Sequence, residues 1–163
     1  MNAAAMLTAV LLLGAGNQVP PEMKVLERLV GTWKSENVVK TAPTTPTAST
    51  GVSKTTLILG GHFTENRNYS NDGALANINM FSYDARGKVY RQWLFDSNGN
   101  TLESTGTWNA DNRTLTFTKE QGGNKGVFSM RFVDDDTVHT NIVWKDAAGK
   151  VTFDFEGKAT RQK

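Results

Sequence analysis

The chain has 163 residues, of which 38% are apolar and 21% charged, and 18 basic against 16 acidic side chains give a formal net charge of +2. This composition is ordinary for one soluble globular domain. The small charge, spread over scattered basic residues, excludes the strong positive footprint of a nucleic-acid-binding protein, so we expect no nucleic-acid partner. The lack of cysteine excludes disulfides, thiolate metal sites and cysteine nucleophiles.

The first residues form an uncharged apolar run. Ala3 to Gly14 includes Leu11-Leu12-Leu13 and leads into the small residues Ala15-Gly16. Such a run is typical of a secretory signal and its cleavage zone, although Met1-Asn2 supplies no Lys or Arg. It is too short for a bilayer span, which takes about 20 apolar residues. We therefore expect residues 1–17 to be a signal peptide, or else an apolar N-terminal helix, and residues 18–163 to form the domain of a secreted or periplasmic protein.

A short helix is predicted at the start of the domain. Pro20-Pro21 stops the preceding segment, and Pro21 suits a first helical position. Apolar residues then recur at helical spacing, at Met23, Leu26, Leu29 and Val30. We predict a helix from Glu22 to Leu29 that Gly31 ends, and a first strand from Thr32 to Val39.

The next stretch, Thr41 to Ser49, has no periodicity and contains Pro43 and Pro46. Proline cannot donate to a strand ladder, so we predict a loop. In a barrel, a long loop at this position is a candidate lid over the open end. A disordered connection is the alternative.

From Val52 onward, short segments rich in threonine, branched and aromatic residues alternate with turn residues. The predicted strands are Val52–Leu59, His62–Tyr69, Ala76–Tyr83, Val89–Phe95, Leu102–Trp108, Thr114–Thr118, Gly126–Val133, Val138–Trp144 and Val151–Thr160. The later turns begin at intervals of 12 or 13 residues, at Asp84, Ser97, Ala110, Gly122, Asp134 and Asp146. Turns this short join antiparallel neighbours, and a twisted sheet of about ten strands leaves two exposed edges unless it closes. The sequence therefore predicts an all-β fold, a closed up-and-down antiparallel barrel of about ten strands with a short N-terminal helix.

Alternation within the strands predicts which side chains face inward. Leu115 and Phe117 form one such set, and the others are Phe128, Met130 and Phe132, and Val151, Phe153 and Phe155. The strand from Ala76 to Tyr83 is ambiguous. Its apolar residues occupy both faces, with Ile78 and Met80 on one and Phe81 and Tyr83 on the other, and a one-residue change of register would exchange them.

These patterns resemble the calycin superfamily, which includes lipocalins and fatty-acid-binding proteins. The resemblance lies in Gly31-Thr32-Trp33 after a short helix, in the antiparallel meander and in the final Thr160-Arg161. It implies that Trp33 packs beneath the barrel and that Arg161 stacks across it, so both are expected to close the barrel. The motifs Ser82-Tyr83-Asp84, Gly106-Thr107-Trp108 and Gly60-Gly61-His62-Phe63 are similar to an uncharacterised bacterial family with a lipocalin-like barrel, which implies a fold and no chemistry.

The remaining candidates concern a ligand inside the barrel. Aromatic and sulfur-containing side chains exceed what a thin core needs, and we predict that Trp93, Trp108, Phe128, Met130 and Trp144 bind a small apolar or amphipathic molecule. Core packing is the alternative for this set. Arg67, Arg91 and Arg131 are candidates for pairing with an acidic group of the ligand if they face inward, and are solvated outer-face residues otherwise.

We expect neither a metal nor a cofactor. The two imidazoles, His62 and His139, fall short of a zinc site, and Asp134-Asp135-Asp136 lacks the alternating ligands of a calcium loop. The leading hypothesis is an exported binding barrel, a monomer or weak dimer. The alternatives are an envelope interaction module with a filled core, a barrel that holds haem through one axial histidine, and an enzyme that places His62 or Tyr69 beside an inward arginine.

Overall fold

The computed structural model describes residues 18–40 and 45–163. The predicted signal segment, residues 1–17, and part of the predicted lid, residues 41–44, lie outside these ranges, so both remain predictions. In the part of the chain that is described, no helix combines the length and apolarity that crossing a membrane requires.

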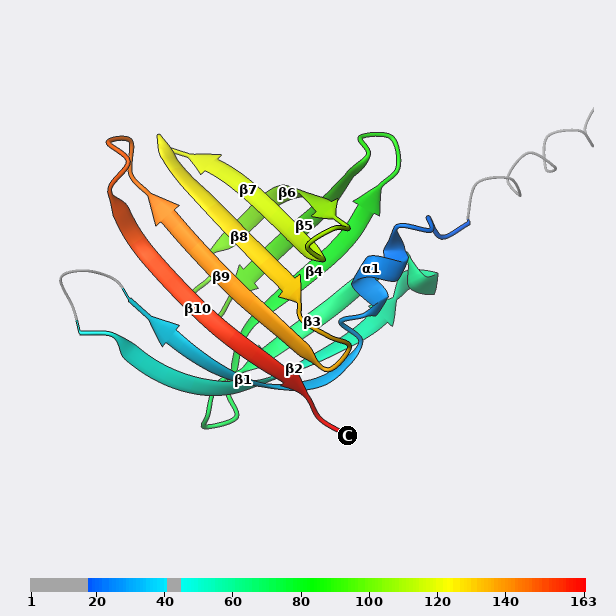
Figure 1. Ribbon diagram of the computed structural model, residues 1–163, viewed down its shortest axis with the longest axis horizontal. Helices are drawn as coiled ribbons and strands as arrows, with labels where there is room; N and C mark the ends of the chain where they lie inside the picture. Colours follow the sequence, from blue (N-terminus) through cyan, green and yellow to red (C-terminus); the bar gives the residue numbers. More distant parts are fainter. Residues whose placement is uncertain (1–17, 41–44) are drawn as a thin grey trace, which may run out of the picture.

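Ten antiparallel strands form one closed barrel, as predicted (Figure 1). Each strand pairs with its neighbours in the sequence, and β1 closes the ring by pairing with both β2 and β10. The strands are β1 Gly31–Val39, β2 Thr47–Ile58, β3 Phe63–Tyr69, β4 Leu75–Asp84, β5 Val89–Asp96, β6 Thr101–Asn109, β7 Thr114–Gln121, β8 Asn124–Phe132, β9 Thr137–Lys145 and β10 Val151–Arg161. The register sets Trp33 opposite Arg161 at the closing seam.

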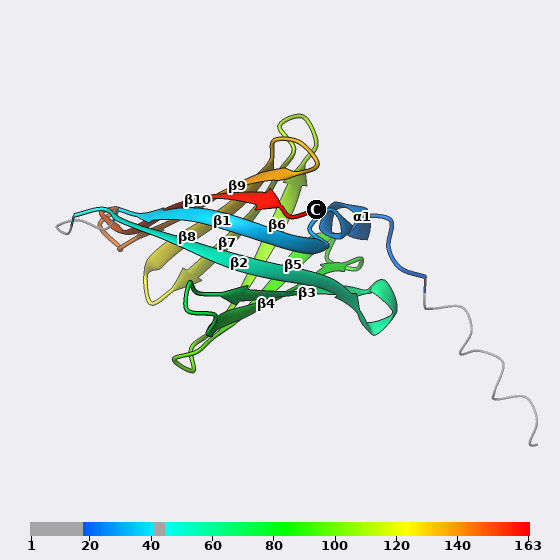
Figure 2. The same cartoon turned by 90° about the horizontal axis from the view of Figure 1, so that it is seen from below.

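One end of the barrel is covered by the helix α1, Met23–Glu27 (Figures 1 and 2). Met23 and Leu26 on this helix are both 0% exposed. The hydroxyl of Tyr90 on β5 donates a hydrogen bond to the Glu22 carbonyl, 3.1 Å away, which ties the helix to the barrel wall. The hairpins that join β3 to β4, β5 to β6, β7 to β8 and β9 to β10 lie at the opposite end, which we call the mouth.

The main hydrophobic core lies at the end covered by the helix. It comprises Met23, Leu26, Leu29, Trp33, Phe81, Tyr90, Leu115, Phe117, Met130, Phe132 and Val138. Burial of one such side chain contributes about 1.5–3 kcal/mol. The interior of the barrel is therefore packed most tightly at the end next to α1.

The structure departs from the sequence predictions in the ends of most elements, usually by one to three residues, and in the facing of Val151. The helix is shorter than Glu22–Leu29 because the Leu29 and Val30 amides bond back three residues, in tight turns. Strand β2 begins at Thr47, five residues before the predicted start at Val52, because it pairs with β1 as far as Val39. At the mouth, Val151 is 39% exposed because the register shifts between it and Phe153.

The ambiguous strand β4 turns Phe81 and Tyr83 inward. Phe81 is 3% exposed, and the Tyr83 ring packs edge-on against Tyr90 with centroids 5.0 Å apart. Because side chains alternate along a strand, Asn77 and Asn79 share this inward face. The apolar pair on the other face of β4 points away from the interior.

Candidate functional site

Arg161 and Trp33 meet at the end covered by α1. The Arg161 guanidinium lies 4.2 Å from the centroid of the Trp33 ring, and Trp33 Nε1 donates to the Leu29 carbonyl at 2.8 Å. The same guanidinium donates to the carbonyls of Arg28, at 2.8 Å, and Val30. These bonds fasten the last strand to the segment that precedes the first strand, so the two side chains join the ends of the sheet.

Gly31 is needed for this contact. Its φ of +129° is a backbone conformation that residues with a Cβ rarely adopt. A Cβ at this position would also lie 2.8 Å from an Arg161 nitrogen. The Gly-x-Trp pattern in the sequence is thus a packing requirement of the seam.

The three consecutive aspartates, Asp134 to Asp136, serve this same end of the barrel. Asp135 accepts from Arg28 at 2.9 Å and lies 3.5 Å from Arg113, while Asp136 accepts from Arg161 at 3.1 Å. Asp135 and Asp136 thus balance the charge of the arginines at this end of the barrel, while Asp134 accepts from the Asp136 amide at 2.8 Å. In residues 18–40 and 45–163, no group of three histidine or acidic side chains could hold a metal ion.

Between the core and the mouth, the barrel encloses a cavity of about 770 Å³. This volume is within the range of about 300–1,000 Å³ typical of small-molecule sites. A completely filled interior, one of the alternatives considered from the sequence, would leave no such space. The lining divides into a polar wall and an apolar wall on different strands.

The polar wall is a chain of neutral side chains that runs across β2 to β6. Ser104 donates to Gln92 at 2.7 Å, Gln92 to Asn79 at 2.8 Å, and Asn79 to Asn77 at 2.9 Å. Asn68 donates to both Asn77, at 2.8 Å, and Asn66, at 2.6 Å, and Asn66 donates to Thr55 at 2.7 Å. Gln92 and Ser104 are each 5% exposed. Because each member holds the next, the chain fixes the orientation of these amides toward the cavity.

The apolar wall comes from β7 to β10. Its side chains are Phe117, Phe128, Met130, Ile142, Trp144, Phe153 and Phe155. The rings of Phe117 and Phe128 are stacked, with centroids 5.7 Å apart and planes tilted by 16°. The Trp144 indole covers Gly126 so closely that a Cβ there would lie 2.6 Å from two ring carbons. Flat aromatic surfaces therefore face the chain of amides across the cavity.

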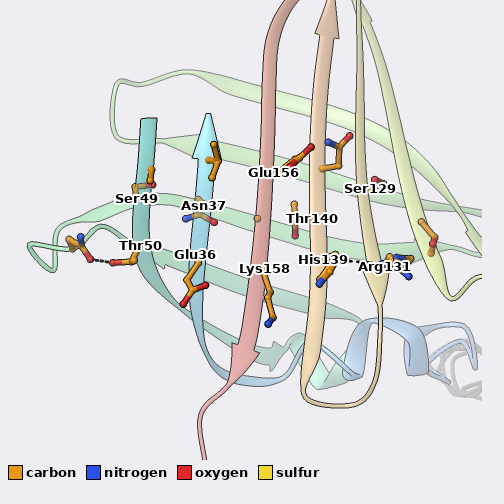
Figure 3. Close-up of a pocket in the computed structure, with 16 residues that line it drawn as sticks. Glu36, Asn37, Ser49, Thr50, Ser129, Arg131, His139, Thr140, Glu156 and Lys158 are labelled. Carbon is orange, nitrogen blue, oxygen red and sulfur yellow. Dashed lines mark hydrogen bonds between the residues drawn. The ribbon is translucent and has the colours of Figure 1, made fainter. Parts of the chain in front are cut away.

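The lining described by the structure contains no Asp, Glu, Arg or His. Its charged residues are Lys119 and Lys158. Lys119 lies near the mouth, opposite Gly126 in the β7–β8 ladder. Lys158 is exposed and stands beside Glu36 on the outer face (Figure 3). The deep part of the cavity is consequently uncharged.

The structure separates the predicted aromatic set into three places. Phe128, Met130 and Trp144 line the cavity. Trp108 faces inward but packs edge-on against Phe132 in the core, with centroids 5.8 Å apart. Trp93 alternates with the inward Gln92 and lies outside the barrel, where its ring is 6.1 Å from that of Phe63.

The three arginines proposed to meet an acidic ligand all lie on the outer face. Arg67 pairs with Glu65 at 2.6 Å and lies opposite the outward Ile78 of β4. Arg91 pairs with Asp84 at 2.9 Å and with Glu103 at 3.0 Å. The pKa of Asp84 is lowered, first by the Gly87 amide that donates to it and then by Arg91. These guanidiniums already have partners in solvent and do not reach the cavity.

Arg131 and both histidines also stand away from the cavity. Arg131 lies 3.4 Å from the ring nitrogen of His139, and both side chains are exposed on the outer face (Figure 3). His62 follows the short turn Leu59–Gly61 at the end covered by α1. Within residues 18–40 and 45–163, the interior therefore contains no histidine that could serve as an axial ligand of haem. It also lacks the inward arginine that the enzyme hypothesis requires beside His62 or Tyr69.

A second hollow, a groove of about 910 Å³, follows the outer face of β1, β10, β9 and β8 (Figure 3). The pairing registers set Glu36, Lys158, His139 and Arg131 in one row across these strands. All four are exposed. The charged side chains of this groove are of both signs and are exposed to water, which weakens their attraction for a ligand. A ligand in the groove would also bury little apolar surface, so we regard the interior as the stronger site.

The sequence analysis missed the polar wall. A signal was present, since Asn66 and Asn68, and then Asn77 and Asn79, are spaced by two residues on consecutive strands. Asparagine is depleted in strands, so this repetition is unusual. We overlooked it because polar residues in an alternating pattern are ordinarily assigned to the solvent face.

Comparison with solved structures shows a shared fold at low sequence identity. Rv2717c from M. tuberculosis superposes with a TM-score of 0.66 and 14% identity over 90% of this chain and 100% of that one. The S-type phycobiliprotein lyase CPES from Guillardia theta gives a TM-score of 0.58 and 11% identity over 86% of this chain and 92% of that one. A DUF3598-family protein of unknown function from Nostoc punctiforme gives a TM-score of 0.56 and 12% identity over 84% of this chain and 48% of that one.

No curated protein matches the sequence. A family profile does match, over residues 19–161, which include the helix and all ten described strands. The chain therefore belongs to the family described as "Protein of unknown function (DUF1579)".

Proposed function

We propose that this protein is a binding barrel that takes one small amphipathic molecule into its interior. The observation that carries the proposal is the cavity of about 770 Å³ between an amide-lined wall and an aromatic wall. A protein interior is normally packed to crystal density, and a void of this size costs stability whatever its use, so we take its presence as support for a ligand site. The calycin-like architecture expected from the sequence supports the same proposal.

The two walls favour an amphipathic ligand over a purely apolar one. An alkane-like molecule would cover the amides of Asn66, Asn68 and Asn77 without replacing the water that they contact, and burying unpaired amides is costly. A molecule with one polar edge satisfies them and still removes the rings of Phe128 and Trp144 from water. This refines the prediction of an apolar or amphipathic ligand.

The test is a titration with N-phenyl-1-naphthylamine, an uncharged fluorescent probe. We expect it to bind in a one-to-one ratio with a rise in probe fluorescence. The variant Leu102→Trp fills the cavity, because Leu102 on β6 is one of its lining residues. It should weaken binding by about tenfold or more, which corresponds to about 1.4 kcal/mol.

The matched control is Thr101→Trp, which places the same indole on an exposed neighbour in the same strand. This variant should change the affinity less than twofold. Absence of probe binding, or equal effects of the two tryptophans, would refute binding in the interior. Thermal unfolding of both variants shows that the barrel is intact.

A further inference from the structure

The hydrogen bonds of the polar wall leave particular atoms available. The Asn77 oxygen accepts from both Asn79 and Asn68, and the Asn68 amide nitrogen uses its two hydrogens on Asn77 and Asn66. An amide offers two donor hydrogens and one acceptor oxygen. The donors of Asn77 Nδ2 and the acceptor Asn68 Oδ1 therefore have no partner among the described residues.

Both of these atoms can be reached from the cavity. Asn68 and Asn77 line it, and they are partners in the β3–β4 ladder. The polar atoms that are buried and unpartnered in the described residues belong to other side chains, Thr64 and Asp154. Asn77 Nδ2 and Asn68 Oδ1 thus remain accessible, as one donor and one acceptor on two side chains that are bonded to each other.

The surroundings select against a charged ligand. Among the residues that the structure describes, no arginine lines the cavity to pair with a carboxylate, and no aspartate or glutamate lines it to pair with a cation. An unpaired charge is expensive to remove from water. Lys119 also lines the cavity near the mouth, and it stands on β7, three strands along the sheet from β4, which carries Asn77.

We propose that the ligand is an uncharged, flat molecule with an amide-type edge, such as a lactam or cyclic imide. Its donor and acceptor bond to Asn68 and Asn77 while its ring lies against the apolar wall of Phe128 and Trp144. This inference rests on the proposed interior binding and specifies the class of ligand.

The experiment compares four matched three-ring probes on the wild-type protein. They are 6(5H)-phenanthridinone, its N-methyl derivative, phenanthrene and phenanthrene-9-carboxylate, and each is titrated by displacement of N-phenyl-1-naphthylamine. Phenanthridinone should bind most tightly. N-methylation blocks the donor and should weaken binding about fivefold or more, and phenanthrene and the carboxylate should also be weaker, because each hydrogen bond lost in a wet site costs a factor of a few.

Two variants then test whether the amide-type edge of the probe binds at Asn77. Asn77→Ala should reduce phenanthridinone affinity about fivefold and bring it close to that of the N-methyl compound. Its effect on phenanthrene should be under twofold. Asn124→Ala, on the exposed β7–β8 hairpin, is the matched control and should change neither affinity.

The outcomes separate the two proposals. If all four probes bind equally and Leu102→Trp weakens each, interior binding holds and the amide-type edge is refuted. If the carboxylate binds most tightly, the neutral-ligand inference is refuted. If N-phenyl-1-naphthylamine itself does not bind, the proposed function fails. Should Asn77→Ala fail to fold, the wild-type probe series still decides the matter.

Discussion

Two glycines on the inner face of the barrel give a sharp test of how the cavity is built. Gly126 on β8 lies opposite Trp144 on β9, and Gly106 on β6 lies opposite Phe117 on β7. An added methyl group at Gly126 would lie 2.6 Å from two carbons of the indole. At Gly106 it would lie 2.6 Å from a Phe117 ring carbon and equally close to the Thr116 carbonyl oxygen. Both substitutions by alanine create a clash.

The cost differs because the two rings differ in their freedom to move. Trp144 is half-buried and borders the cavity, so its indole can tilt into empty space. Phe117 also lines the cavity, but it is 1% exposed and its ring is held between those of Phe81 and Phe128. At Gly106 the clash also involves the Thr116 backbone carbonyl, which cannot move aside as a side chain can. Overpacking costs about 1–3 kcal/mol. We expect Gly126→Ala near the lower limit and Gly106→Ala near the upper limit, which for a chain of this size corresponds to losses in Tm of roughly 3 °C and 9 °C.

Thermal unfolding followed by circular dichroism measures these losses. Gly126→Ala should also lower the affinity for N-phenyl-1-naphthylamine, by about threefold or more, because the displaced indole would occupy part of the cavity. Titration with the probe measures this loss. Thr107→Ala, an exposed neighbour of Gly106, is the control and should stay within about 0.5 kcal/mol. Equal destabilisation by the two glycine variants, with probe affinity unchanged by Gly126→Ala, would refute the claim that Trp144 borders an empty space.

Three further predictions concern stability. Arg161→Ala leaves the carbonyls at the seam without a donor and should lower the free energy of unfolding by about 3 kcal/mol in chemical denaturation. Arg161→Lys should recover less than half of that loss. A loss below about 1 kcal/mol for Arg161→Ala would contradict the role of Arg161 in joining the ends of the sheet. Burial raises the pKa of Tyr90 from 10.0 to about 12, so Tyr90 ionises in the unfolded chain at a lower pH than in the folded protein. Stability should therefore fall by roughly 2–3 kcal/mol between pH 10 and 12. Tyr90→Phe should not show this loss, and an unchanged loss in that variant would contradict the prediction. Hydrogen bonds from the Gly87 amide to Asp84, and from the Asn100 side chain to Asp96, hold the pKa of both carboxyls below the ordinary value of 3.8. Their contribution to stability is therefore present above that pH and lost as pH falls below it, and NMR titration of either carboxyl with a midpoint at or above 3.8 would disagree.

The fold could be predicted from the sequence because its strongest signals are local and repeated. Turn residues at intervals of 12 or 13 leave room only for antiparallel hairpins, and alternation such as that of Phe128, Met130 and Phe132 identifies the inner face. The end of the predicted loop was misplaced because Thr47 joins β2 through its pairing with β1. Pairing partners are not visible in a segment that contains prolines.

The site could be predicted only in part. Aromatic alternation correctly suggested an apolar inner surface, and the structure puts Phe128, Met130 and Trp144 on it. Arg91 could not be assigned to a face, because β5 carries large side chains on both sides, Tyr90 and Leu94 on one and Trp93 and Phe95 on the other. Trp93 shows this most clearly, since Phe63 covers it outside the barrel. The amide wall depends on cross-strand hydrogen bonds between β2 and β6, which a single sequence does not display.

The most direct test of the central claim uses the side-chain amides as reporters. In ¹⁵N-edited NMR spectra of the intact protein, addition of 6(5H)-phenanthridinone should shift the side-chain NH₂ signals of Asn68, Asn77 and Gln92, which line the cavity. The signals of Asn98 and Asn124, which are exposed in mouth hairpins, should stay in place. Shifts confined to exposed amides, or no shifts at saturating probe, would contradict binding between the two walls of the barrel.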